Sequence, residues 1–331
     1  MNSFSIDGLL RKPETGAFLG LVFVFLFFLI FGGTTFVSVQ GIASWLNVAA
    51  NLGIIAVPIG FLMIAGELDI SVGAMVPGAS MCIGVLCGYY GLPTLVGIAA
   101  TLAFAVLVGW VNGIIVVRTA VPSLIVTMGT LFAILGLMLF LSVLLTGTTA
   151  VSLKSPAWAK MLLGSFVFDT YQVIIFWWLG LTAAYIFFLH YSKWGNWVLA
   201  LGGDKASARN AGIPTDKLTI WLFILSSVSS AFVGMTQAIL FNSAQVSSGM
   251  SFIFNSIIAV VVGGVLLTGG FGSVIGIFFG TITFAIVNQG IYFTDFDRNL
   301  SSVIIGVMLL VAVLMNNTFR KMALTYSPRK K

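Results

Sequence analysis

The sequence predicts an all-α integral membrane protein with about ten transmembrane helices and with both termini in the cytoplasm. Composition is the first of three observations behind this prediction. Of the 331 residues, 59% are hydrophobic and 7% are charged, whereas soluble domains carry about 25% charged residues. Long apolar runs recur along the whole chain, and basic residues gather in alternate connections between them. A water-exposed globular surface cannot be built from this composition, so soluble classes of protein are excluded.

Ten apolar runs approach the length that a bilayer requires, which is about 20 residues for a helix. Run 72–90 is rich in glycine and contains Pro77, and run 252–267 is short. The predicted spans are 17–36, 42–65, 72–90, 94–117, 121–146, 172–190, 218–241, 252–267, 273–292 and 300–317.

The distribution of basic residues predicts the orientation. Ten spans place both termini on one side, and Lys and Arg concentrate on the cytoplasmic side of membrane proteins. With cytoplasmic termini, 12 of the 15 basic residues lie in cytoplasmic segments, and Lys154, Lys160 and Arg298 lie outside. The formal net charge of +6 is therefore a topology signal, and we expect no nucleic acid partner.

We expect residues 1–331 to form a single transmembrane domain with two structured connections. In the periplasmic loop 147–171, Ser155 followed by Pro156 is typical of a helix start. In the cytoplasmic loop 191–217, an alanine-rich stretch runs to Gly212, with Pro214 just beyond, which is typical of a helix end. The sequence therefore predicts a short helix in each loop.

The sequence shows no clear motif for catalysis or metal binding. No G-x-x-x-x-G-K-[ST] motif occurs, so the chain has no P-loop for a nucleotide phosphate. His190 is the only histidine, and the only cysteines, Cys82 and Cys87, lie in an apolar run. This argues against a zinc site and against a disulfide framework. We expect no catalytic residue, no metal and no cofactor in this chain.

Neutral polar side chains inside the spans are candidates for lining a solute pathway. Each could equally be an interhelical hydrogen bond, worth about 0.6 kcal/mol on average in measured cases. No buried Lys, Arg or His is present to bind an anionic solute, so the set suits a neutral hydroxylated one. The pathway candidates are Asn47, Asn51, Asn112, Thr127 and Asn288; Gln237, Asn255 and Gln289 are further polar residues in spans.

Three glycines, Gly272, Gly276 and Gly280, are spaced four residues apart, which places them on one face of a predicted helix. Small residues at this spacing let helix backbones approach closely. The contact they favour lies either within one subunit or between two copies.

The stretch GELDISVG, residues 66–73, holds two of the nine carboxylates, Glu67 and Asp69. The predicted topology places it at or near the cytoplasmic end of the second span. In one interpretation Asp69 or Ser71 caps the next helix. In the other, Glu67 or Asp69 pairs with a basic residue of the cytoplasmic face or of a partner and helps to gate the inner end.

Four stretches of this chain together resemble the permease subunits of bacterial ABC importers for monosaccharides, of the ribose, xylose, arabinose and galactose type. The resemblance covers residues from about 42 to 317. It is specific because all four stretches occur and occur in this order. They are GELDISVG at 66–73, VPSLIVTMGT at 121–130, GGDKASARNAGI at 202–213 and GGVLLTGGFGSVIGIFFGT at 263–281.

The resemblance implies a non-catalytic permease of the bacterial inner membrane, surrounded by lipid, that works in two copies, either identical or related. Two ATPase subunits would bind ATP and Mg on the cytoplasmic face, and a periplasmic sugar-binding protein would dock outside. By the same resemblance, one cytoplasmic segment corresponds to the helix that couples permease to ATPase. Its residues are Gly202, Gly203, Asp204, Ala208, Arg209, Gly212 and Ile213.

The chain departs from the family pattern at three positions. Glu67 stands where the family usually has Gly, Asp204 where Asn is common, and Leu199 where Tyr is common. The resemblance therefore does not imply the substrate of any particular member.

A stand-alone secondary transporter or channel for a small neutral solute is the alternative. It would be expected to show ionisable residues within the membrane or a recognisable filter, and the sequence shows neither.

Overall fold

The computed structural model describes residues 13–246, 249–295, 297, 299–300, 302–307 and 310. Its helices are α2 (Pro13–Phe36), α3 (Val39–Ile64), α4 (Val72–Ile83) continued by the π-helix η1 (Gly84–Tyr89), α5 (Thr94–Arg118), α6 (Ser123–Thr146), α7 (Ala157–Leu163), α8 (Ile174–Tyr191), α9 (Lys193–Gly203), α10 (Lys205–Asn210), α11 (Thr215–Phe241), α12 (Ser251–Val262), α13 (Val274–Gly290) and the 3₁₀ turn η2 (Ile291–Phe293). Short strands form two antiparallel pairs, β1 (Ala150–Ser152) with β4 (Ser243–Gln245) and β2 (Phe166–Val167) with β3 (Tyr171–Gln172).

Among the described residues, eight helices are long and apolar enough to cross a membrane. This confirms a helical, multi-pass membrane protein. Helix α4 and η1 together make the glycine-rich span, Val72–Tyr89. The predicted span 252–267 is shorter than expected, because α12 has only 12 residues. The predicted span 300–317 lies mostly outside the described residues.

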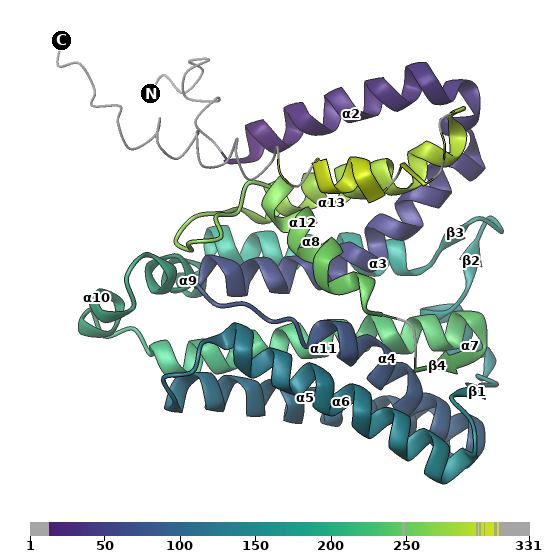
Figure 1. Ribbon diagram of the computed structural model, residues 1–331, viewed down its shortest axis with the longest axis horizontal. Helices are drawn as coiled ribbons and strands as arrows, with labels where there is room; N and C mark the ends of the chain where they lie inside the picture. Colours follow the sequence, from purple (N-terminus) through teal and green to yellow (C-terminus); the bar gives the residue numbers. More distant parts are fainter. Residues whose placement is uncertain are drawn as a thin grey trace.

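Helix α3 lies at the centre of the bundle. Every residue from Leu52 to Ile64 is buried, as expected for a helix that is apolar on all faces. Around it pack α8, α11, α12 and α13, while α11 also packs against α4 and α5, and α2 covers α13. Figure 1 shows α5 and α6 on the side of the bundle opposite α2.

The two connecting loops lie at opposite ends of the bundle (Figure 1). Loop 147–171 contains β1, α7 and β2 and ends at β3. Strand β1 pairs with β4, which follows α11, and β2 pairs with β3. Helix α7 begins one residue later than the sequence predicts, with Pro156 in the capping position. Loop 191–217 contains two short helices, α9 and α10, where the sequence predicts one. Helix α2 begins at the same end as α9 and α10.

Helices α4 and α12 both begin inside the bundle and run to opposite ends (Figure 1). Their starts touch, since a Cβ on Gly73 of α4 would overlap the side chain of Ile253 in α12. The far end of α4 reaches strand β4, where Gly84 packs against Ala244. Discontinuous helices of this kind are characteristic of transporters, in which they bring non-helical backbone to the interior.

One close contact in the core predicts a measurable cost. Trp178 of α8 is 1% exposed and stacks on Phe278 of α13, with ring centroids 4.8 Å apart. A Cβ on Gly53 of α3 would overlap the Trp178 indole nitrogen. We expect Gly53→Ala to destabilise the fold by about 1–3 kcal/mol through overpacking, measured as a lower unfolding temperature in detergent. Gly129→Ala is the matched control, because nothing lies within 4 Å of its added Cβ; equal unfolding temperatures of the two variants would contradict this packing.

Candidate functional site

The segment between α3 and α4, Gly66–Ser71, is the centre of the candidate site and is called the α3–α4 linker below. Helix α3 ends there because Gly66 adopts the left-handed conformation (φ 84°). The Glu67 N–H donates to the Leu62 carbonyl at 2.8 Å, and the Gly66 N–H donates to the Met63 carbonyl at 3.0 Å. These two bonds form a Schellman cap, after which the chain runs extended into the bundle (Figure 1).

Side chains of α6 supply the hydrogen bonds that the extended linker lacks. The Leu68 N–H donates to Ser123 Oγ at 3.0 Å, and the Ile70 N–H donates to Thr127 Oγ1 at 3.2 Å. An unpaired backbone N–H at this depth would cost several kcal/mol, so these two hydroxyls explain how non-helical backbone is tolerated there.

Asp69 organises a buried polar network at the start of α4. Its side chain is 1% exposed, and Oδ1 accepts from the Ser71 N–H at 2.9 Å and from the Ser71 hydroxyl at 2.5 Å. The Asn112 amide of α5 donates to Ser71 Oγ at 3.1 Å, and Thr130 of α6 donates to Asn112 Oδ1 at 2.5 Å. The network ties the start of α4 to both neighbouring helices.

The depth of Asp69 differs from the sequence prediction. The sequence places the stretch at the cytoplasmic end of a span, yet the linker carries Asp69 and Ser71 into the bundle, where both are buried. Glu67 stays near the end, with its side chain 16% exposed. The predicted pathway candidates Asn112 and Thr127 are 0% exposed and belong to the network around the linker.

The other predicted pathway residues lie elsewhere. Asn47 is hydrogen-bonded to the β2–β3 hairpin: it donates to the Thr170 carbonyl at 3.0 Å and accepts from the Gln172 N–H at 2.9 Å. Asn51 donates to the Gln172 side chain at 3.0 Å and lines a cavity of about 10 Å³, which is about the smallest that can hold one water molecule. Asn288 is half-buried and accepts from its neighbour Gln289 at 2.8 Å.

The predicted coupling residues lie together on α9, α10 and the following turn. Asp204 caps α10, because its Oδ1 accepts from the Ser207 N–H at 2.6 Å; hydrogen bonding from Ser207 lowers the pKa of Asp204. Gly212 is left-handed (φ 81°), and the Ile213 N–H donates to the Ala208 carbonyl at 3.1 Å, which closes the helix.

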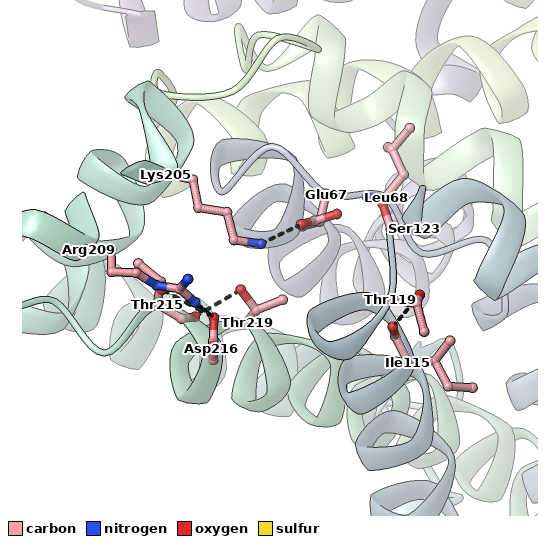
Figure 2. Close-up of polar contacts among 10 residues, drawn as sticks. All are labelled: Glu67, Leu68, Ile115, Thr119, Ser123, Lys205, Arg209, Thr215, Asp216 and Thr219. Atoms are coloured by element: carbon pink, nitrogen blue, oxygen red, sulfur yellow. Dashed lines mark hydrogen bonds and ion pairs between the residues drawn. The ribbon is translucent and has the colours of Figure 1, made fainter. Parts of the chain in front are cut away.

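Two ion pairs join α10 to its neighbours, as Figure 2 shows. Arg209 pairs with Asp216 of α11 at 2.5 Å. Lys205 pairs with Glu67 of the α3–α4 linker at 3.8 Å. The second pair connects the predicted coupling segment directly to the linker.

Backbone also meets backbone at this end of the bundle, in a group that we call the glycine junction: Ile64, Gly66, Gly202, Gly269 and Gly270. The Gly270 N–H donates to the Ile64 carbonyl at 2.8 Å. A Cβ on Gly202 would overlap that same carbonyl oxygen, and a Cβ on Gly269 would lie 3.1 Å from Gly66. The junction therefore holds the end of α9 against the end of α3 and the α12–α13 turn. Gly203 is different, because its added Cβ would meet nothing within 4 Å.

The predicted packing glycines have different surroundings. A Cβ on Gly276 would overlap the Gly263 carbonyl, and a Cβ on Gly280 would overlap the Ala259 carbonyl, so both lie against α12 of the same chain. Gly272 precedes α13, whose capping residue is Ser273, and it lies against the Ile64 side chain. The three glycines therefore do not share one helix face.

The sequence reasoning missed Lys205, Ser123 and Thr130 as members of the site. Lys205 was readable, because it lies within the stretch GGDKASARNAGI that contains the predicted coupling residues. Nothing in the sequence separates Ser123 and Thr130 from other hydroxyls in spans, because their role comes from linker backbone far away in the chain.

Residues 41–313 match a family model described as the permease component of the branched-chain amino acid transport system. The chain belongs to this permease family. The fructose import permease protein FrcC of Rhizobium meliloti is 28% identical, over 94% of this chain and 87% of FrcC. The xylose/arabinose import permease protein XylH of Sulfolobus acidocaldarius is 31% identical, over 92% of this chain and 86% of XylH. The inner membrane ABC transporter permease protein YjfF of Escherichia coli is 28% identical, over 85% of this chain and 84% of YjfF.

These relationships make the chain a transport permease subunit of an ABC import system and a multi-pass protein of the inner membrane. They do not favour the alternative of a stand-alone transporter or channel. No solved structure matches the permease significantly.

The network around Asp69 predicts that an acceptor oxygen matters more there than a negative charge. Asp69→Asn keeps Oδ1, so we expect stability within about 1 kcal/mol of the wild type. Asp69→Ala leaves the Ser71 groups unpaired, and we expect a loss of about 1–3 kcal/mol. Thermal unfolding in detergent measures both variants. An equal loss in the two variants would show that the charge, and not the hydrogen bond, is required.

Proposed function

We propose that this permease forms the translocation pathway for a monosaccharide or a similar neutral polyhydroxylated solute. The names of two relatives support the substrate class, since one imports fructose and another xylose and arabinose. The spans themselves agree with an uncharged solute, because they offer neutral polar groups. In Thr94–Arg118 and Thr215–Phe241, Lys, Arg and His occur only in the first or last turn.

We further propose how the permease is oriented in the membrane and which proteins it contacts. The end with α9 and α10 faces the cytoplasm, as the basic residues indicate, and both termini lie on that side. Separate ATPase subunits bind ATP and Mg and contact α9 and α10. A periplasmic sugar-binding protein docks at the end with α7 and the strand pairs, and a second permease copy, identical or related, completes the pathway.

The observation that carries this proposal is the double connection of the coupling segment, to the end of α3 and to the α3–α4 linker. Helix α9 touches the end of α3 through Gly202, and α10 reaches the linker through the Lys205–Glu67 pair. The linker is bonded in turn to α5 and α6. A displacement of α9 and α10 by the ATPase would therefore shift the start of α4 relative to its neighbours, and ATP would bias the pathway because it binds the two arrangements differently.

Reconstitution tests the function as a whole. The permease is co-expressed with the proposed ATPase and binding-protein partners, purified and placed in liposomes with ATP. We expect the ATPase to co-purify and labelled fructose, xylose or arabinose to enter with ATP only. Uptake that proceeds without any ATPase would contradict the proposal.

Gly202 and its neighbour give a matched test of the coupling contact. Gly202→Ala forces a Cβ into the Ile64 carbonyl, so we expect ATP hydrolysis to continue while most sugar uptake is lost. Gly203→Ala has open space around the added Cβ and should keep uptake. Comparable uptake by the two variants would remove the glycine junction from the coupling path.

The Lys205–Glu67 pair predicts a smaller, reversible effect. Exposed ion pairs are worth about 0.2–1 kcal/mol, so Glu67→Lys or Lys205→Glu alone should lower uptake by about two- to fivefold. The double exchange should restore uptake. Lys217→Glu makes the same charge change away from the linker and serves as the control. A double variant no better than the single ones would argue against the pair.

A further inference from the structure

The first two turns of α12 present a small polar and aromatic face that none of the described residues covers. Ser251 is exposed, Phe254 is 69% exposed and Asn255 is half-buried. Their spacing of three and four residues places them on one side of the helix. From Ile258 to Val261 the helix is buried, so the uncovered face is confined to its start.

This face lies near the middle of the bundle, between its two ends. Helix α12 begins inside the bundle, where Ile253 packs against Gly73 at the start of α4, and runs from there toward α9 (Figure 1). The uncovered turns are therefore well removed from both ends of the long helices. They do not belong to a water-exposed loop.

The polar groups of this face are unsuited to lipid. Among the described residues, no hydrogen bond joins the Ser251 hydroxyl or the Asn255 amide to another group. In hydrocarbon, each such group would cost several kcal/mol. Helix α6 gives the contrast, because its exposed large side chains are all apolar, among them Phe132 and Phe140. The face of α6 suits lipid, whereas the face of α12 requires water or a polar ligand.

We propose that Ser251, Phe254 and Asn255 form a sugar-contact site in the middle of the pathway; this rests on the proposed function. The ring of Phe254 can stack on the apolar C–H face of a sugar, while an amide and a hydroxyl can each donate to and accept from sugar hydroxyls. None of the three side chains is ionisable, which matches an uncharged ligand. Phe254 supplies the stacking surface, and Asn255 is the residue that reads the hydroxyl pattern.

The first test measures exposure to water directly. In a variant with both native cysteines, Cys82 and Cys87, replaced by alanine, single cysteines are placed at positions 251, 254, 255 and 132. A membrane-impermeant charged thiosulfonate is added to the permease–ATPase complex in liposomes. We expect modification of S251C, F254C and N255C to be at least about tenfold faster than that of F132C, because thiolate forms in water and not in lipid.

Two results of this labelling would overturn the proposal. Rates equal to that of F132C would place the face against lipid. Spontaneous disulfides between two copies, together with protection from the reagent, would make it a contact between copies.

The second test separates substrate contact from coupling. Asn255→Leu should lower uptake by about tenfold or more, the order expected for one lost hydrogen bond to the sugar, and should leave ATP hydrolysis within about twofold. Asn255→Gln should recover part of the uptake, and Phe132→Ala should keep it. Parallel loss of uptake and hydrolysis in Asn255→Leu would overturn the contact role. If the wild-type complex imports none of the three sugars, the proposed function fails, while the labelling still decides whether the face lines an aqueous path.

Discussion

The arrangement depends on one constraint: backbone N–H groups cannot stay unpaired in the interior of a membrane protein. The α3–α4 linker breaks the helical pattern at that depth, and its Leu68 and Ile70 N–H groups are paired by hydroxyls of α6. Asp69 performs the same task for Ser71 at the start of α4. Because these bonds come from other helices, the linker cannot move without moving α5 and α6 or exchanging its partners. This makes it suitable as a switch between two arrangements.

The same constraint explains why glycine matters where α9 meets α3. A backbone hydrogen bond joins the α12–α13 turn to the end of α3, and Gly202 lies against the bonded carbonyl. Contact between backbones transmits a displacement with little loss, since no flexible side chain lies between them. The Lys205–Glu67 pair adds a weaker and more exposed connection. Glu67, a departure from the family pattern, thus has a partner on the coupling segment.

Composition and run length predicted the helical membrane fold, because hydrophobic length reports directly on bilayer thickness. The cap signal at Gly212 was also readable, since a left-handed residue favours glycine, whereas the same role of Gly66 was not predicted. Depth was not readable, because Asp69 follows an apolar run that looks like any span. Its burial depends on the tertiary bond from Asn112 to Ser71, to which Asp69 is joined by a local bond. Asn255 looked like the other span amides, and its uncovered position emerges only from how α12 packs.

Hydrogen–deuterium exchange on the complete permease–ATPase complex tests the central claim most directly. Exchange is followed in peptides covering 66–71 and 202–213, with and without ATP bound to a hydrolysis-deficient ATPase. The account predicts that ATP changes the exchange of both segments together. A change confined to 202–213, with the linker amides equally protected in both states, would contradict it.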